Sequence, residues 1–158
     1  MTIYAANASK RLGRDYWMVV NSFSFYIGKK EDNVTITVPA GYLTDGGTIP
    51  RLFWVAIPPW GDHGQAAILH DHLCEYLVVS NNGTSQAITR KQADEILLTA
   101  MEVTGVPKLK RNIIYYAVSL FRVVTNRKKA SFNHKKFMIE EELRKELSGG
   151  QYEAFGTT

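Results

Sequence analysis

Cysteine and long apolar runs are nearly absent from this sequence. Its 158 residues include one cysteine, Cys74, which excludes an internal disulfide framework and a zinc site built from several cysteines. The apolar runs are too short for a membrane-spanning helix. The first nine residues lack the basic start and apolar stretch of a signal peptide. We therefore expect a protein of a reducing cytoplasm.

Acidic residues are missing from one long stretch. Residues 104–138 contain no Asp or Glu but carry nine Lys and Arg residues. Such a segment produces a local positive field, which suits the phosphates of nucleic acid or of an anionic lipid surface. A solvated helix face, neutralised from elsewhere in the fold, is the alternative. The residues expected to meet lipid or nucleic acid are Lys108, Lys110, Arg111, Arg122, Arg127, Lys128 and Lys129.

The apolar pattern favours an α+β fold. Side chains alternate at period two over residues 16–28 and again over 34–38, which predicts an N-terminal β-hairpin. Residues 40–61 are rich in glycine and proline and predict a long connection. We expect the hairpin and this connection to pack on an antiparallel core of three main helices. Length predicts a single globular domain over 1–147 with a flexible tail over 148–158.

Apolar residues recur at helical spacing from residue 62 onward. The pattern predicts four helices, of which the last is charged, and a polar loop over 80–88. Asp62 is expected to cap the first helix, and Thr89 with Gln92 to form a capping box on the second. Residues expected to face inward on the third helix are Ile113, Ile114, Ala117, Leu120, Phe121 and Val124. The predicted helices cover residues 62–79, 89–105, 108–127 and 135–147.

One histidine and two aspartates carry the most specific chemistry. His70 falls inside the apolar stripe of the first helix and Asp71 at its edge, because adjacent helical residues differ by about 100°. The short link between the first two helices favours antiparallel packing, which would bring Asp94 to His70. A carboxylate bonded to one imidazole nitrogen leaves the other as a general base for water. We therefore predict His70 and Asp94 as catalytic residues and Asp71 as an oxygen ligand for calcium or magnesium.

The connection before the first helix supplies further candidate ligands. Residues 41–50 read Gly-Tyr-Leu-Thr-Asp-Gly-Gly-Thr-Ile-Pro, and the paired glycines let the backbone turn carbonyls or amides toward a ligand. Carbonyls would complete a calcium shell, whereas amides would form an oxyanion site. The metal ligands expected here are Asp45, Gly46 and Gly47.

Several of these motifs together resemble a family of phage-encoded domains of unknown function. The residues that carry the resemblance run from Val38 to Arg51, with Phe53-Trp54, Ala67 to Asp71, and Arg90 with Ala93-Asp94 further on. The resemblance implies a bacteriophage or prophage origin. It also implies a location in the bacterial host cytoplasm or in the virion, with a phage or host macromolecule as partner.

The order of the motifs is also similar to that of phospholipases of the A-two type, including the parvoviral capsid form. These enzymes have a glycine-rich calcium loop, a helix with His-Asp and a second helix with an orienting Asp. The resemblance implies calcium-dependent hydrolysis of lipid esters, with His70 as the base, Asp94 as the orienting carboxylate and Asp71 as a calcium ligand. Cys74 stands where these enzymes have a tyrosine, and we expect it to be a small buried hydrophobic residue.

Two other functions fit the sequence. A non-enzymatic virion component or host-interaction protein would use the basic residues of 108–136 as its working surface. His70 would then be a core residue, and Asp94 would only stabilise a helix N-terminus. A metal-dependent phosphohydrolase of the His-Asp class would need further ligands on several helices, for which the sequence offers only His63 and His134.

Overall fold

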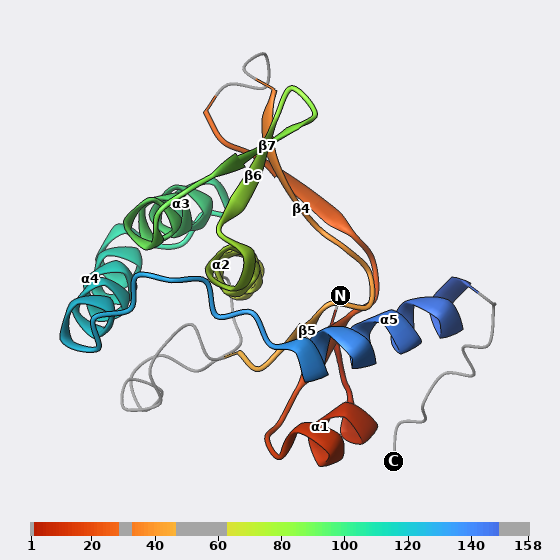
Figure 1. Cartoon of the computed structure of the whole chain (residues 1–158). Coiled ribbons are helices and arrows are strands. Elements are labelled where there is room, and N and C mark those ends of the chain that lie inside the picture. The colour runs from red at the N-terminus through yellow and green to blue at the C-terminus, as the bar shows by residue number, and fades with distance from the viewer. Residues whose placement is uncertain (1, 29–32, 47–62, 149–158) are drawn as a thin grey trace. The chain divides into compact units, whose positions relative to one another are not determined.

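The computed structural model describes residues 2–28, 33–46 and 63–148 of the chain. Within these ranges the protein has both helices and two antiparallel sheets, so the expected α+β class is confirmed. The chain divides into two compact units, which interleave along the sequence (Figure 1). The first unit comprises residues 1–23, 39–45 and 133–158, and the second comprises residues 24–38 and 46–132.

The first unit combines the N-terminal residues with the last helix. Its strands are β1 (Thr2–Tyr4), β2 (Trp17–Val19) and β5 (Leu43–Thr44), and its helices are α1 (Ala6–Leu12) and α5 (His134–Ser148). The three strands pair antiparallel in the order β1-β2-β5. Burial of apolar side chains holds the unit together, with a core of Ala8, Tyr16, Met18, Leu43 and Ile139.

A close approach of backbone to helix fixes β5 against α5. The backbone N–H of Leu43 donates a hydrogen bond of 2.9 Å to the carboxylate of Glu140, which is fully buried. Gly41, two residues earlier, has φ +81°, and a Cβ there would lie 2.7 Å from Cγ of Arg144. Only glycine combines this left-handed backbone with so short a distance.

The second unit has a sheet of order β3-β4-β6-β7. The expected hairpin is present as β3 (Phe23–Tyr26) and β4 (Val34–Val38), and β4 pairs antiparallel with β6 (Val78–Asn81). The sequence prediction of one strand over 16–28 was too long: it contains both β2 and β3, which belong to different sheets. Alternation alone does not reveal such a break, because it continues across the change of sheet.

The prediction of a polar loop over residues 80–88 is wrong, because the structure has a β-hairpin there. β6 turns through Asn82 and Gly83, both with positive φ, into β7 (Thr84–Ala87). An Asn-Gly pair between two strands is typical of a tight hairpin. All four residues of β7 are exposed, so the strand has no apolar face that would have made it visible in the sequence.

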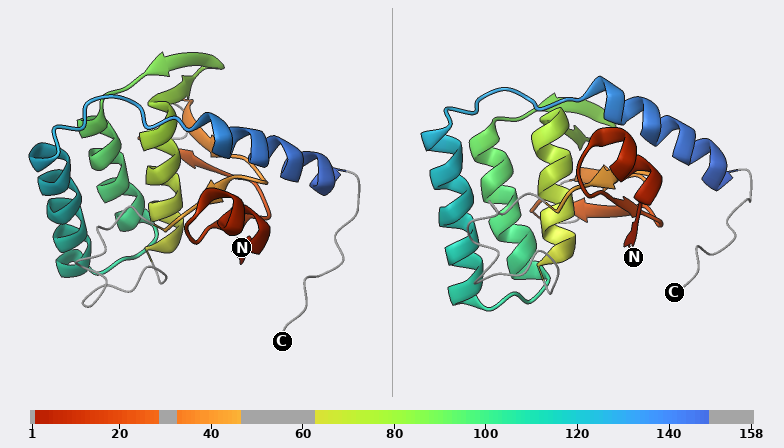
Figure 2. Two further views of the ribbon diagram at one scale, coloured as in Figure 1. Left: turned by 60° about the horizontal axis from the view of Figure 1, so that its bottom comes forward. Right: turned by 90° about the horizontal axis from the view of Figure 1, so that it is seen from below.

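Beyond this sheet, the described part of the second unit contains three helices. α2 (Gly64–Tyr76), α3 (Arg90–Val103) and α4 (Lys108–Val124) run antiparallel, each beside the next (Figure 2), and α2 also packs against β4. The capping box of Thr89 and Gln92 at the start of α3 is confirmed. The N-cap position of α2 is taken by His63 rather than Asp62, which lies outside the described residues.

The apolar face of α4 differs from the prediction. Ile114 and Ala117 are buried as expected, and Val118 is buried with them. The other four residues expected to face inward are exposed instead, because α4 lies at the edge of the helical layer and only one side of it meets α3 (Figure 2). Their exposed fractions are 45% for Ile113, 60% for Leu120, 40% for Phe121 and 74% for Val124.

The domain boundaries of the sequence analysis stay predictions. The expected tail over 148–158 begins at Ser148, the last residue of α5, and its other residues lie outside the described part of the chain.

Candidate catalytic site

His70 and Asp94 meet at the centre of the second unit. Nε2 of His70 lies 2.9 Å from Oδ1 of Asp94, and the two side chains are 4% and 2% exposed. The antiparallel packing of α2 on α3 brings them together, as the short link between the two helices predicts. A carboxylate at Nε2 favours the tautomer with its proton on that nitrogen, and leaves Nδ1 as the basic nitrogen of the neutral ring.

Arg122 holds the other side of the Asp94 carboxylate. Its Nε donates a hydrogen bond of 2.6 Å to Oδ2 of Asp94, and Ser119 Oγ lies 3.4 Å from the same oxygen. Both residues lie on α4, so three helices contribute to one chain of interactions: His70 on α2, Asp94 on α3 and Arg122 on α4. The two hydrogen bonds fix both oxygens of a buried carboxylate, which would otherwise be costly to bury.

Cys74 lies one helical turn after His70 on α2. Its Sγ is 3.5 Å from Nε2 and 3.9 Å from Nδ1 of His70, and the side chain is 9% exposed. The expected burial of Cys74 is confirmed. Its contact with the imidazole is a feature that sequence reasoning missed, although residues at i and i+4 of a helix share one face.

These neighbours change the proton affinities of the pair. Burial lowers the pKa of His70, but the Cys74 sulfur and the Asp94 carboxylate raise it and dominate, giving a pKa of about 10. Burial raises the pKa of Asp94, but hydrogen bonds from His70 and Arg122 outweigh burial and hold it below its ordinary value. The pair is therefore an imidazolium–carboxylate ion pair at neutral pH.

The expected metal ligands are divided between the two units. Asp71 is half-buried on α2 beside His70. Asp45 belongs to the first unit, where it accepts a hydrogen bond of 2.8 Å from Nη1 of Arg14. Gly46 is buried with φ +64°, and Gly47 lies outside the described residues.

The described side chains do not by themselves form a metal site. In the part of the chain that the structure describes, no three or more His, Cys, Asp and Glu residues gather in a way that could hold a metal ion. The positively charged guanidinium of Arg14 already pairs with Asp45. The ligand set that a His-Asp phosphohydrolase needs is likewise not found among these residues.

The basic residues of α4 and the segment after it have different surroundings. Arg122 belongs to the Asp94 network, and Arg111 donates a hydrogen bond of 2.6 Å to Glu102. Lys108, Lys128 and Lys129 are exposed, and so is Arg127, whose guanidinium lies 5.2 Å from the centre of the Phe121 ring. Lys110, on the first turn of α4, is half-buried. Arg122 is thus a site residue that the sequence analysis assigned to a binding surface.

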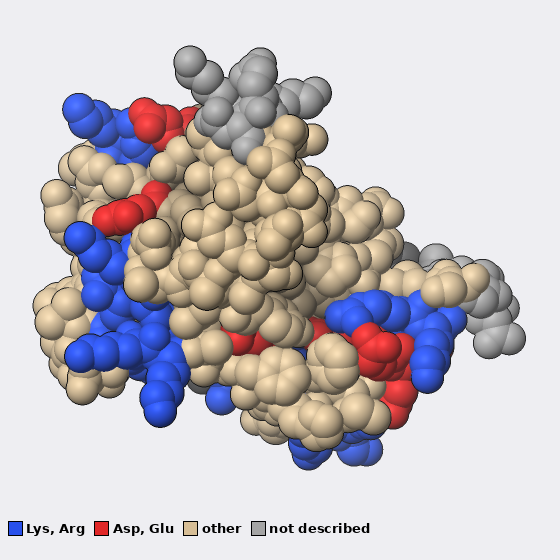
Figure 3. Space-filling model, turned by 45° about the horizontal axis from the view of Figure 1, so that its top comes forward, with Lys and Arg blue, Asp and Glu red and all other residues tan. Residues whose placement is uncertain are grey.

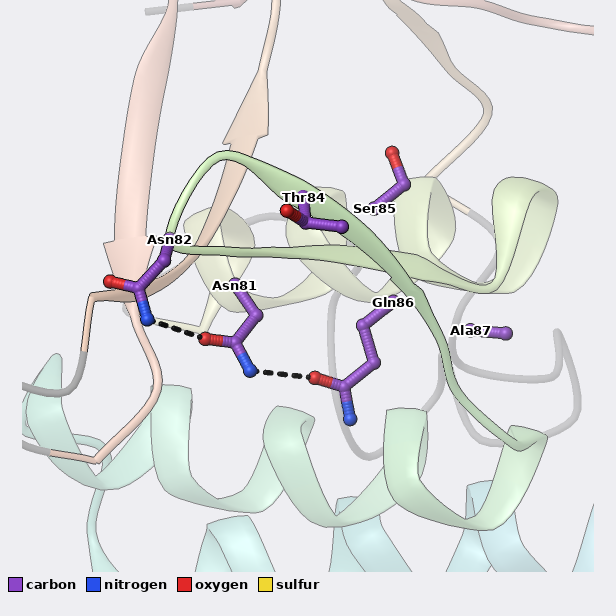
Figure 4. Close-up of a pocket in the computed structure, with 6 residues that line it drawn as sticks. All are labelled: Asn81, Asn82, Thr84, Ser85, Gln86 and Ala87. Carbon is purple, nitrogen blue, oxygen red and sulfur yellow. Dashed lines mark hydrogen bonds between the residues drawn. The ribbon is translucent and has the colours of Figure 1, made fainter.

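A separate open hollow lies along the β6–β7 hairpin (Figure 4). Amide side chains line it: Asn82 donates to Asn81 at 3.2 Å, and Asn81 donates to Gln86 at 3.0 Å. Its other lining residues are Thr84, Ser85 and Ala87. None of these residues titrates near neutral pH, so the hollow offers no acid or base.

The fold and site define an α+β protein in which three antiparallel helices enclose a buried Cys-His-Asp cluster, with the half-buried Arg122 bonded to its aspartate. A family model described as "Protein of unknown function (DUF1353)" matches residues 17–118, and the chain belongs to this family. The family of unknown function expected from the motifs is thereby confirmed in its coarse form. Phage origin and the likeness to phospholipases are outside what the family description says and stay predictions.

The chain is also similar to part of a curated protein. Over 86 residues it is 30% identical to "Uncharacterized protein y4jT" from Sinorhizobium fredii (strain NBRC 101917 / NGR234). The match covers 53% of this chain and 23% of that protein, so the chain spans less than a quarter of its relative's length. No solved structure matches. Among the described helices, none is long and apolar enough to span a membrane.

Proposed function

We propose that this protein hydrolyses lipid esters, with His70 as the general base and Asp94 as the residue that positions it. The observation that carries the proposal is the 2.9 Å hydrogen bond between two buried side chains on adjacent antiparallel helices. A histidine oriented by a carboxylate recurs in water-activating and nucleophile-activating sites. The likeness in motif order to phospholipases of the A-two type suggests the lipid ester as the substrate.

The proposed reaction uses the two imidazole nitrogens differently. Nε2 keeps its proton and donates a hydrogen bond to Asp94, while Nδ1 takes a proton from water as the water oxygen attacks the ester carbonyl. The imidazolium then returns that proton to the leaving alkoxide, so a carboxylic acid and an alcohol are released. Asp94 stabilises the imidazolium, and Arg122 keeps Asp94 ionised and in place.

The raised pKa of His70 sets a condition on this reaction. A histidine with a pKa of about 10 is mostly protonated at neutral pH, and only the neutral ring accepts a proton from water. The rate of ester hydrolysis should therefore rise with pH through the alkaline range, because the fraction of neutral His70 rises.

Calcium is part of the proposal only as a requirement to be tested. The donor groups that the phospholipase likeness assigns to it are Asp71, Asp45, Gly46 and Gly47. The described side chains do not by themselves gather into a metal site. Loss of activity with a chelator, restored by added calcium, would support the requirement.

The proposal is tested with vesicles of fluorogenic phosphatidylglycerol at pH 8–9. Wild type should release fatty acid, and His70→Gln should lose at least about 99% of the rate, since a positioned general base contributes about a hundredfold or more. His134→Gln is the matched control, because it makes the same change at an exposed histidine of α5 and should keep the full rate. Circular dichroism should show the same helix content in all three proteins. Equal rates for wild type and His70→Gln would refute the proposal.

A second candidate function is a non-enzymatic one, in a virion component or a host-interaction protein. The observation in its favour is that the His70 imidazolium is bonded to Asp94 and in contact with Cys74 at the same nitrogen, as in a structural ion-pair network. In that case wild type would release no fatty acid from any vesicle, and His70→Gln would change only the stability of the protein. A phage origin is compatible with both candidate functions.

A further inference from the structure

α4 carries a second apolar face that no described element covers. Leu109, Ile113, Tyr116, Leu120 and Val124 are 75%, 45%, 67%, 60% and 74% exposed. Their spacing of three and four residues places them within about 80° of one another on an α-helix. These five residues are called the α4 stripe below.

The α4 stripe is separate from the face that holds α4 in the fold. Ile114, Ala117 and Val118 are buried, and α4 packs against α3. The stripe residues thus lie beside this buried face, on the exposed side of α4. A contiguous row of large apolar side chains on a protein surface is typical of an interaction site rather than of scattered surface residues.

Positive charges lie at both ends of the α4 stripe. Lys108 begins the helix, and Arg127, Lys128 and Lys129 follow its last turn; all four are exposed. No Asp or Glu occurs over residues 104–138. Figure 3 shows one of its groups of Lys and Arg side chains on the side of the second unit that carries α3 and α4, with Asp and Glu side chains near it. The charge complements an anionic partner.

The apolar α4 stripe and the positive charges at its ends together favour one of three possible partners: a second copy of the chain, nucleic acid or an anionic lipid surface. A second copy of the chain would bring the same cations together around a two-fold axis, which like-charge repulsion opposes. Nucleic acid would use the cations but would leave the aliphatic side chains without a role. An anionic lipid surface uses both, because aliphatic and tyrosine side chains enter the interface while Lys and Arg meet the headgroups.

We propose that the α4 stripe, with Lys108 and Arg127–Lys129 at its ends, is a docking surface for anionic phospholipid bilayers, on which α4 lies parallel to the membrane plane. The inference deepens the proposed lipid hydrolysis, and its link to a substrate rests on that function. Its test measures binding alone, so the two proposals can fail separately.

Binding is measured by co-sedimentation with vesicles of phosphatidylglycerol and phosphatidylcholine, compared with phosphatidylcholine alone. The His70→Gln variant is measured beside wild type so that hydrolysis cannot change the vesicles. Both should bind the anionic vesicles, and raising the salt concentration should weaken binding. Tyr116→Ser with Leu120→Ser should lower the affinity about tenfold or more. Met138→Ser, an exposed apolar residue of α5, is the control and should change little.

The charges are tested with a pair of variants that have equal net charge. Lys128→Glu with Lys129→Glu should lower the affinity for anionic vesicles by about tenfold or more. Lys10→Glu with Lys145→Glu changes exposed lysines of α1 and α5 and should have a small effect. If both pairs weakened binding equally, overall charge and not the α4 surface would be responsible, and the proposal would be wrong.

Four further outcomes would overturn the proposal. They are no binding to anionic vesicles, binding that Tyr116→Ser with Leu120→Ser leaves unchanged, a dimer that this double change dissociates, and tighter binding to duplex DNA that depends on Lys128 and Lys129 alone. Binding without ester release would leave this inference standing and remove the hydrolase. Ester release that the changes to the α4 stripe leave unaltered, without binding through that stripe, would leave the hydrolase standing and remove this inference.

Discussion

Sγ of Cys74 lies 3.5 Å from Nε2 of His70, the nitrogen that also meets Asp94 at 2.9 Å. The sulfur and the carboxylate thus share one imidazole nitrogen. The sulfur lies in contact with the ring and raises the pKa of His70.

Replacing Cys74 by alanine should lower the pKa of His70 toward the ordinary histidine value. The change removes one of the two groups that oppose the effect of burial on His70. Imidazole nitrogen shifts measured by NMR across pH 5–11 report the pKa directly. An unchanged pKa would mean that the sulfur does not stabilise the imidazolium.

The same variant separates two routes to ester hydrolysis. If water is the nucleophile, Cys74→Ala keeps its activity, and its rate rises at a lower pH than in wild type. If the thiol attacks the ester, Cys74→Ala and treatment with iodoacetamide both abolish release. The second result would replace the water mechanism by a covalent one.

Stability should fall as the pH rises through the alkaline range. The pKa of His70 is about 10 in the folded protein against 6.5 for an ordinary histidine, so the folded state binds its proton more tightly than the unfolded state. This contribution is fully present below pH 6.5 and is lost between pH 6.5 and about 10. Urea unfolding at pH 6 and pH 9.5 should show the loss in wild type. His70→Gln should lack this part of the pH dependence.

At acid pH the contribution of Asp94 changes stability in the opposite direction: stability falls as the pH falls. The pKa of Asp94 is lowered from its ordinary 3.8, so its contribution to stability is present above pH 3.8 and is lost as the pH falls through the lower value in the folded state. The interaction of His70 with Asp94 therefore stabilises the protein most between about pH 4 and pH 6.5. A wild-type stability that is the same at pH 6 and pH 9.5 would contradict the assignment of an ion pair.

Arg122→Gln should destabilise the protein by about 2 kcal/mol, because a buried carboxylate loses a charged hydrogen-bond donor. Lys128→Gln is the matched control, since it removes one positive charge at the exposed end of α4, and it should stay within about 0.5 kcal/mol of wild type. Both are compared by urea unfolding at pH 6. Equal effects of the two changes would show that Arg122 acts as a general surface charge and not through Asp94.

Glu140→Gln should destabilise the first unit. Nζ of Lys136 lies 3.4 Å from Oε1 of Glu140 and 4.1 Å from the centre of the Tyr42 ring, and both charged side chains are buried. Neutralising Glu140 leaves the buried ammonium without its carboxylate, which costs about 3 kcal/mol. Glu146→Gln, at an exposed position of the same helix, should have almost no effect in thermal unfolding. A similar shift for both variants would contradict this account.

The helical part of the fold was predictable because its apolar residues repeat at helical spacing. The predicted helix over 108–127 is α4, and the packing of α2 on α3 brings His70 to Asp94 as expected. A stripe on one helix faces the next, so residues on facing stripes meet.

What could not be predicted depends on tertiary contacts. α1 and β1 have no strong period, and β7 is exposed along its length, so neither the 3.6-residue nor the two-residue pattern marks them. Arg122 looked like one basic residue among nine until the fold placed Asp94 beside it. The outward face of α4 looked like core, because a sequence pattern does not tell which apolar face of a helix has a partner.

The most direct test of the central claim is a double-mutant cycle of His70→Gln and Asp94→Asn on fatty-acid release from phosphatidylglycerol vesicles. If Asp94 acts only through His70, each single change lowers the rate, and the double variant is no slower than His70→Gln alone, because residues that act as a unit are not additive. Losses that multiply, or a His70→Gln protein as active as wild type, would contradict the claim that Asp94 positions His70 as the general base.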